Sequence, residues 1–293
     1  MHKIADMSAQ AIEASRQRLE KALAGDADLA SLLNRFDRWA QDLWDGAVVV
    51  YDAHTVMPQI VDAIVRIHKA RSKELRHRDD QRILQPDWFQ DPNAIGYVCY
   101  TDLFAGDLQG IRKRISYLKG LGVTYLHLMP LLNPRPGNSD GGYAVMDYKS
   151  VRPDLGTMKD LSELAADLHE AGISLTLDLV LNHVAKEHEW ALKARQGDKK
   201  YQDYFYAFPD RKVPDEYEKS LPEIFPTFAP GNFTYYEDMG QWVWTTFNEF
   251  QWDVNWSNPN LFLEYVDIID RKSTRLNSSQ GYISYDVFCL QKK

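Results

Sequence analysis

The chain has 293 residues and a mass of 33.9 kDa, a length that suits two compact domains or one large one. Its hydrophobic content of 44%, with 8 Trp, 16 Tyr and 12 Phe, excludes a disordered polymer, because this much apolar surface can build a sizeable core. The net charge of −8 argues against a nucleic-acid or anionic-membrane partner.

The N-terminus has no apolar signal core, and no stretch approaches the roughly 18 apolar residues that a membrane-spanning helix needs. We therefore expect a cytoplasmic protein that does not bind membranes. The two cysteines, Cys99 and Cys289, form no metal-binding or redox spacing, and we expect neither of them in a disulfide.

Residues 1–91 are predicted to form a helical domain. Apolar residues recur at three- and four-residue steps between Leu29 and Leu43, which is the period of one helix face. We predict one helix over about 9–23 before this segment and another around residues 60–67 after it. The charged run over 71–82 mixes acidic with basic residues, as a solvent-facing helix surface does.

Residues 92–183 alternate short apolar runs with helical ones. We predict strands over 95–101, 123–129 and 173–182, with helices that begin after Asp107 and after Thr157. Strands that alternate with helices pair in parallel. Along the third strand leucines alternate with mostly polar residues, which favours a closed barrel with one face on outer helices and one face inside. The predicted fold class is α/β: the first three strands of a (β/α)8 TIM barrel, preceded by the helical domain.

Residues 184–257 interrupt this alternation. Between 201 and 256, 17 of 56 residues are aromatic, and the segment is too long for an ordinary connection. We predict an insertion subdomain in which most rings form the core and a few line a sugar pocket. A barrel helix over 258–270 is predicted to follow it.

A strand that ends with the pattern D-x-x-x-N-H at Asp178, Asn182 and His183, after a loop with D-G-G-Y at Asp140 to Tyr143, resembles the α-amylase superfamily of glycoside hydrolases and transglycosylases. Within the superfamily the sequence is most similar to the amylosucrases. This similarity lies in the stretches CYTDLFAGDLQGI, LMPLL, GGYAVMDY, LNHVAKEHEWA, IFPTF and WVWTTFNEFQWDVNWSNP, and it covers about residues 1–270.

The resemblance implies roles in substrate binding for four residues. His183 is similar to the histidine that hydrogen-bonds the glucosyl unit next to the scissile bond, and Tyr143 to the aromatic platform beneath that glucose. Asp140 resembles the carboxylate at the closed end of an amylosucrase pocket. Phe247 is similar to a second aromatic wall. For Tyr143 and Phe247 a role in packing alone stays open, and for His183 a purely structural role does.

Asp178 and Asn182 resemble residues that organise the end of the third strand, and a purely structural role for both stays open. A zinc site made of His183, His188 and Glu187 is not expected. The five-residue gap between the histidines does not put both on one helix face, and the sequence has no H-E-x-x-H motif.

The function that the resemblance implies is a retaining glucosyltransferase of carbohydrate metabolism. Such an enzyme forms a β-glucosyl intermediate from sucrose, releases fructose and passes glucose to an α-1,4-glucan, without a metal or organic cofactor. Its partners are sucrose and α-glucan. The alternatives are a sucrose hydrolase or an α-glucosidase of the same superfamily, or a non-catalytic fragment.

The catalytic carboxylates that the resemblance places at the ends of the fourth, fifth and seventh strands have no counterpart in this sequence. Residues 271–293 lack an apolar period and resemble translated adapter-like DNA at the end of a truncated gene. Asp286 lies near the position of the nucleophile, but the expected Arg-x-Asp pattern is absent there. We expect a truncated and inactive chain that keeps sugar-binding residues.

Overall fold

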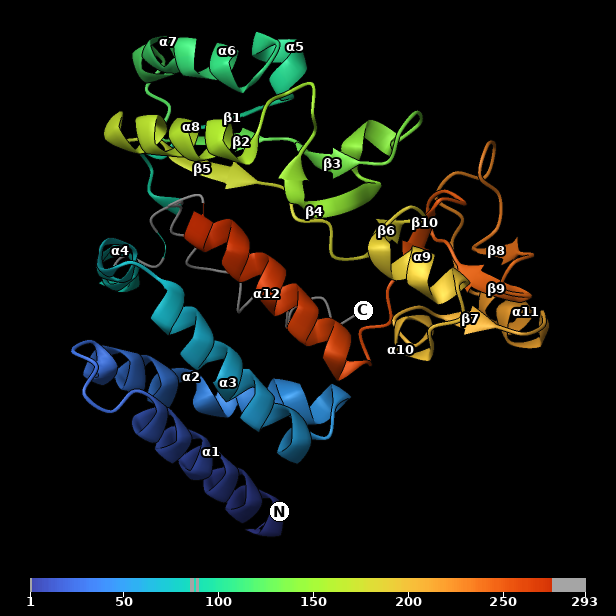
Figure 1. Cartoon of the computed structure of the whole chain (residues 1–293), viewed down its shortest axis with the longest axis horizontal. Coiled ribbons are helices and arrows are strands. Elements are labelled where there is room, and N and C mark those ends of the chain that lie inside the picture. The colour runs from blue at the N-terminus through green and yellow to red at the C-terminus, as the bar shows by residue number, and fades with distance from the viewer. Residues whose placement is uncertain (1, 85–86, 88–89, 276–293) are drawn as a thin grey trace. The chain divides into compact units, whose positions relative to one another are not determined.

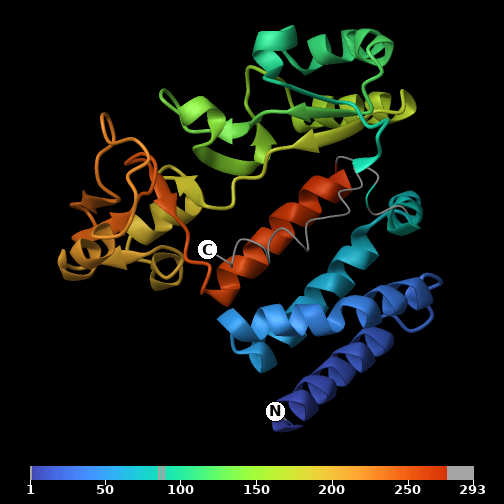
Figure 2. The same cartoon turned by 180° about the vertical axis from the view of Figure 1, so that it is seen from behind.

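The structure is a computed structural model that describes residues 2–84, 87 and 90–275. The described chain divides into two compact units, drawn from opposite sides in Figures 1 and 2. A helical unit combines residues before 90 with residues after 256, and a mixed unit comprises residues 90–256. The predictions about residues 276–293, including Asp286 and Cys289, lie outside the described residues.

Residues 2–84 form helices, as the sequence predicted. Helix α1 packs against α2 and α3 around a small apolar core. None of the described helices is long and apolar enough to cross a bilayer. The core residues are Leu19, Leu33, Phe36, Ala40 and Val61. The helices are α1 (His2–Ala22), α2 (Leu29–Val50), α3 (Ala53–Ala70), α4 (Lys73–Leu84) and α12 (Pro259–Arg275).

Helix α12 belongs to this same unit. It packs against α3, where Arg66 forms an ion pair with Asp267. The rings of Tyr51 and Phe262 lie 5.7 Å apart between their centroids. The sequence predicted a helix here as part of the barrel; the helix forms, and the neighbour that the structure gives it is α3.

Three parallel strands form the sheet of the mixed unit, in the order β1-β2-β5. Helices follow β1 and precede β5, with α6 packed on α8 and α8 on β5 (Figure 1). The parallel pairing predicted from the alternation of strands and helices is confirmed. The elements are β1 (Gly96–Cys99), α5 (Thr101–Ala105), α6 (Leu108–Lys113), α7 (Ile115–Gly120), β2 (Tyr125–Leu128), α8 (Met158–Glu170) and β5 (Ser174–Leu177).

The helix starts of this unit follow their capping residues. The side chain of Asp107 accepts a hydrogen bond from Gly110 N at the start of α6. Thr157 and Asp160 form a reciprocal capping box at the start of α8. The sequence predicted one helix after Asp107, but the structure has two, α6 and α7. The helix is interrupted at Arg114, which has φ −94° and ψ −2°.

The third strand is shorter than predicted. We expected it over 173–182, but β5 ends at Leu177, which is the register partner of Leu128, the last residue of β2. Beyond this pair β2 offers no further backbone partner, so the chain leaves the sheet at Asp178. Ile173 and Leu177 are buried as the alternation predicted, whereas Leu175 is only half-buried.

The connection from β2 to α8 contains a hairpin that the sequence did not predict. Strand β3 (Leu132–Pro134) pairs antiparallel with β4 (Val145–Val151), with register shifts. The tip between them carries the short 3₁₀ helix η2 (Asp140–Gly142). This hairpin presents the D-G-G-Y segment.

The insertion after residue 182 begins with strand β6 (His183–Ala185) and ends with strand β10 (Gln251–Asp253). These two strands pair antiparallel. Between them lies a second sheet in the order β7-β9-β8. Edge-to-face ring pairs such as Phe205 with Trp252 lie in the interior. Only five of the 17 rings over 201–256 are buried and most of the others are half-buried, so these rings form a core less completely than predicted. The elements are α9 (Glu189–Arg195), α10 (Lys199–Gln202), β7 (Ala207–Phe208), α11 (Lys212–Glu218), β8 (Phe233–Tyr236) and β9 (Gln241–Trp244).

Candidate functional site

The six residues singled out from the sequence all lie in the mixed unit of residues 90–256. They come from three places: the tip of the β3–β4 hairpin, the chain from the end of β5 into β6, and the loop before β10. Hydrogen bonds and a ring contact connect them into one cluster. Asp140 and Tyr143 lie at the hairpin tip, Asp178, Asn182 and His183 lie between the end of β5 and β6, and Phe247 lies in the loop before β10.

Asp178 contacts both a neighbouring strand and the hairpin. Its Oδ1 lies 2.9 Å from Nε2 of His127, and its Oδ2 accepts a hydrogen bond from the Tyr143 hydroxyl at 3.4 Å. His127 was not predicted as part of the site. The sequence did contain an indication for His127. Leu126 and Leu128 alternate with it in β2 and are buried, so His127 lies on the other face of the sheet.

His183 lies at the centre of the cluster and is 4% exposed. Its ring centroid is 5.1 Å from that of Phe247, with an interplanar angle of 59°. Its Nε2 is 3.0 Å from Gln251 Nε2 and 3.2 Å from the carbonyl oxygen of Tyr143. Burial lowers the pKa of His183 to about 4, so the ring is neutral at pH 7 and offers one donor and one acceptor.

The backbone around Asp140 is held in an uncommon conformation. Asp140 has φ 53°, and Gly141 and Gly142 follow with φ 66° and 97°. A Cβ on Gly142 would lie 3.0 Å from the carbonyl oxygen of Pro130. The turn holds the Asp140 carboxylate where its Oδ2 accepts a hydrogen bond from Gln251 Nε2 at 3.0 Å. Gln251 was not predicted, because one glutamine among aromatic residues carries no pattern.

Asn182 is exposed at the edge of the cluster, with its Nδ2 3.4 Å from His183 Nδ1. Asp253 is the register partner of His183 in the β6–β10 pair. Its carboxylate accepts hydrogen bonds from Thr246 Oγ1 at 2.5 Å and from Thr246 N at 3.1 Å. Burial raises the pKa of Asp253 to about 6.

The neighbours of His183 that a zinc site would recruit have other partners. His188 Nδ1 accepts a hydrogen bond from Trp190 N at 3.1 Å and caps α9. Glu187 is bound by Arg135 through two guanidinium nitrogens, the shorter contact being 2.8 Å. Within the part of the chain that the structure describes, no group of three metal-ligating side chains converges.

The cluster combines hydrogen-bonding groups with aromatic surface. A neutral imidazole, two carboxylates and an amide supply both donors and acceptors. Burial, with Asp178 nearby, raises the pKa of Tyr143 to about 12, so its hydroxyl stays protonated at neutral pH. Ring faces beside such groups suit a sugar, which has apolar C–H faces and polar hydroxyls.

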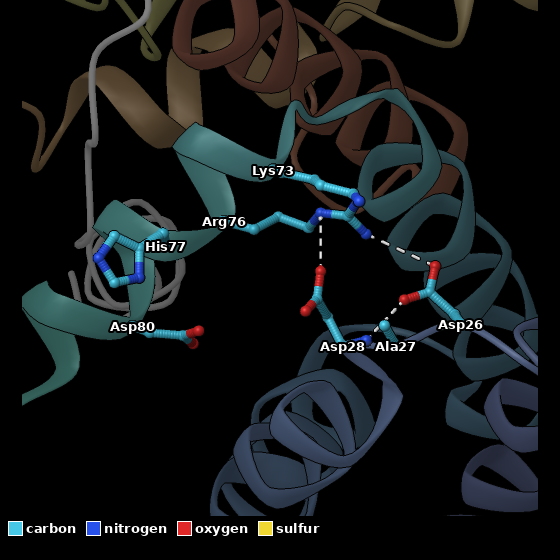
Figure 3. Close-up of a pocket in the computed structure, with 7 residues that line it drawn as sticks. All are labelled: Asp26, Ala27, Asp28, Lys73, Arg76, His77 and Asp80. Carbon is cyan, nitrogen blue, oxygen red and sulfur yellow. Dashed lines mark hydrogen bonds and ion pairs between the residues drawn. The ribbon is translucent and has the colours of Figure 1, made fainter.

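A separate hollow lies in the helical unit, with a volume of about 420 Å³. Figure 3 shows Arg76 of α4 extending toward Asp26 and Asp28 of the turn between α1 and α2. The residues that line this hollow carry both positive and negative charges, and none of them is a predicted site residue. The lining residues are Asp26, Ala27, Asp28, Lys73, Arg76, His77 and Asp80.

The chain matches one family model and several known proteins. Residues 83–275, more than half of the chain, match the family model "Alpha amylase, catalytic domain". The oligo-1,6-glucosidase of Halalkalibacterium halodurans is 35% identical over 61% of this chain and 29% of its own length. The trehalose synthase of a Pimelobacter species is 34% identical over 59% of this chain and 28% of its own length.

Solved structures of related proteins also match this chain. The trehalulose synthase of Pseudomonas mesoacidophila matches with a TM-score of 0.55 and 31% identity, over 62% of this chain and 33% of that one. The chain thus spans about a third of the length of these relatives, and its three-stranded sheet is a partial (β/α)8 barrel. It belongs to the α-amylase family of glycoside hydrolases and glycosyltransferases.

Proposed function

We propose that the full-length protein is an amylosucrase-like glucosyltransferase, and that the cluster around His183 binds the glucosyl unit of sucrose. The observation that carries this proposal is the convergence of Asp140, Tyr143, His183 and Phe247 in one place. These residues span more than 100 positions of the sequence, from Asp140 to Phe247, and each matches a sugar-contacting position by resemblance.

In the proposed reaction these residues bind and orient the glucose. The Tyr143 ring packs beneath the sugar, and the neutral His183 and the Asp140 carboxylate bond its hydroxyls. The carboxylates that form the β-glucosyl enzyme and protonate the departing fructosyl oxygen belong to later strands of the barrel. Contacts to hydroxyls accelerate the reaction only where they strengthen in the oxocarbenium-like transition state.

Sucrose as the donor is supported by one relative in particular. A trehalulose synthase variant has been solved in complex with the substrate sucrose, and it matches this chain with a TM-score of 0.57 and 31% identity, over 66% of this chain and 34% of that one. The acceptor, an α-1,4-glucan, rests on the resemblance to amylosucrases alone.

A second function is supported by other relatives. The oligo-1,6-glucosidase named above favours an α-glucosidase, and a sucrose hydrolase would use the same glucose-binding residues. The test is a protein expressed from the intact gene and incubated with sucrose, with and without glycogen, and separately with isomaltose. Growth of the glucan with release of fructose supports the transferase. Glucose released in step with fructose indicates a sucrose hydrolase, and cleavage of isomaltose alone indicates a glucosidase.

For the 293-residue chain itself we propose that no turnover of sucrose occurs. Neither the nucleophile nor the acid/base residue has a counterpart in the sequence, and loss of even one such group removes orders of magnitude in rate. The measurement is fructose release by the purified chain beside a full-length relative prepared in the same way. Release above background that disappears in Asp286→Ala would overturn the proposal.

A further inference from the structure

Gln251 connects two residues of the cluster from a position that has no access to solvent. Its side chain is 0% exposed, and its Nε2 lies 3.0 Å from Asp140 Oδ2 and 3.0 Å from His183 Nε2. A buried amide is costly unless both its nitrogen and its oxygen have partners. The partners of Gln251 therefore determine how the amide is oriented.

Asn248 fixes this orientation. The Gln251 Oε1 atom accepts hydrogen bonds from Asn248 N at 3.1 Å and from Asn248 Nδ2 at 2.7 Å. Reversing the amide would place its oxygen against the Asp140 carboxylate and its NH₂ group against two donors. The two hydrogens of Gln251 Nε2 thus point to Asp140 and to His183.

A nitrogen that receives a hydrogen bond must present a lone pair, so His183 Nε2 is unprotonated in this arrangement. The carbonyl oxygen of Tyr143, 3.2 Å away, would instead accept from a protonated Nε2. That carbonyl already accepts a hydrogen bond from Val145 N at 3.1 Å, so it does not need the histidine. The contact with Gln251 therefore decides the state of Nε2.

The other ring nitrogen of His183, Nδ1, has a neighbour that favours the tautomer with the proton on Nε2. Asn182 Nδ2 lies 3.4 Å from His183 Nδ1, and it would donate to an unprotonated Nδ1. Asn182 is exposed, so water can replace this long contact, whereas water cannot reach Gln251. The buried hydrogen bond therefore outweighs the exposed one.

We propose that Gln251 is a positioning residue that holds His183 in the tautomer with its proton on Nδ1. Because burial keeps the ring neutral, the ring then has one fixed donor and one fixed acceptor. For sugar binding, which rests on the function proposed above, Nδ1–H is the donor that His183 offers. A hydroxyl that meets Nδ1 is bound through its oxygen.

The test is the tautomer of His183 in the ¹⁵N-labelled 293-residue chain at pH 7, read from two-bond ¹H–¹⁵N correlations of the imidazole rings. The signals are assigned by their loss in His183→Asn. We expect a protonated Nδ1 and an unprotonated Nε2 in the wild-type chain. In Gln251→Glu the carboxylate can only accept, so the major form should reverse to Nε2–H. Gln241→Glu makes the same change on β9 and should leave the signals as they are.

A second variant covers the case in which the added charge prevents folding. Gln251→Met has a similar length and no donor, so Nε2–H should become the major form and donate to the Tyr143 carbonyl. A protonated Nε2 in the wild-type chain overturns the proposal whatever the variants do. So does an unchanged tautomer in a folded Gln251 variant.

Titrating the same labelled chain with maltose separates this inference from the proposed function. Maltose-dependent shifts at His183 together with an unprotonated Nδ1 would keep the sugar site and overturn the role of Gln251. A protonated Nδ1 that does not respond to maltose would support the role of Gln251 and count against the sugar site.

Discussion

The side chains of His127 and Asp178 meet across the β2–β5 pair, with His127 Nε2 2.9 Å from Asp178 Oδ1. Asp178 is the first residue beyond the last backbone pair of these strands, Leu128 with Leu177. The contact therefore continues the connection between the two strands past the point where their main-chain hydrogen bonds end. Both side chains are only partly exposed, at 28% and 21%.

We expect His127→Leu to lower the free energy of unfolding by about 1 kcal/mol, because a partly buried carboxylate loses a hydrogen-bond partner. Urea unfolding followed by tryptophan fluorescence measures the effect. The matched control is His169→Leu at an exposed position in α8. Equal costs for the two substitutions would show that the contact with Asp178 contributes nothing.

A second prediction concerns Arg135 and Glu187, which form a bidentate pair over the Phe250 ring. The paired side chains are 15% and 26% exposed, so solvent screens them incompletely. A double-mutant cycle with alanine should give a coupling free energy of about 1–2 kcal/mol.

The control is the pair Lys219–Glu216, whose side chains are 66% and 72% exposed. Its coupling should be about 0–0.5 kcal/mol, because water and salt screen exposed pairs. A coupling for Arg135 and Glu187 no larger than for this pair would contradict the prediction.

The third prediction is that stability falls on mild acidification. Burial lowers the pKa of His183 and of His188 to about 4, below the value of about 6.5 in an unfolded chain. Between these values the unfolded chain binds more protons, so the free energy of unfolding decreases as the pH is lowered. His188→Asn retains an acceptor for the start of α9 and cannot be protonated. It should remove more than half of this decrease, because the raised pKa of Asp253 opposes the decrease over the same range, as measured by urea unfolding between about pH 7 and pH 4.5.

Asp253 provides a test of the opposite sign. Burial raises its pKa to about 6, above the ordinary value of about 3.9, so here the folded chain binds more protons. This contribution to stability is fully present below the unfolded value and is lost as the pH rises through about 6. Asp253→Asn removes it, and the variant should lose more stability than the wild-type chain between about pH 6.5 and pH 4. A shallower dependence in the variant would contradict the assignment.

The fourth prediction compares two glycines of the β3–β4 hairpin. Gly142 and Gly137 have φ 97° and 74°, and a Cβ on Gly142 would lie 3.0 Å from the Pro130 carbonyl oxygen, whereas on Gly137 it would meet nothing within 4 Å. Gly137→Ala should cost about 1 kcal/mol for its backbone conformation alone. Gly142→Ala should cost at least about 1 kcal/mol more, because it adds a steric clash. Thermal unfolding of both variants measures the difference, and equal shifts would exclude the clash.

The sequence predicted those parts of the fold that depend on local patterns. Caps such as Thr157 and Asp107 mark helix starts because their side chains bond nearby backbone N–H groups, and the structure shows these bonds. The parallel sheet followed from the alternation of strands and helices. These features need no knowledge of distant residues.

Features that depend on distant partners were not predictable in the same way. The apolar alternation continues past Leu177, so it could not reveal that β2 stops at Leu128 and ends the pairing. Gln251 gains its place in the site only because β10 pairs with β6, which brings it within reach of His183. The D-G-G-Y and D-x-x-x-N-H segments were found because they resemble a known family, and their meeting point depends on tertiary structure.

The antiparallel pairing of β6 with β10 forms a narrow neck for the insertion, with Ala185 opposite Gln251 and His183 opposite Asp253. Residues 186–250 therefore begin and end at the same place, the β6–β10 pair. Lengthening such a closed loop costs little free energy, because the entropy of closure grows only slowly with length. The part of this segment that lies before Phe247 and Asn248 can therefore change in length while the contact between His183 and Gln251 is kept. The outer part of the insertion can thus vary in sequence without rebuilding the residues at its base.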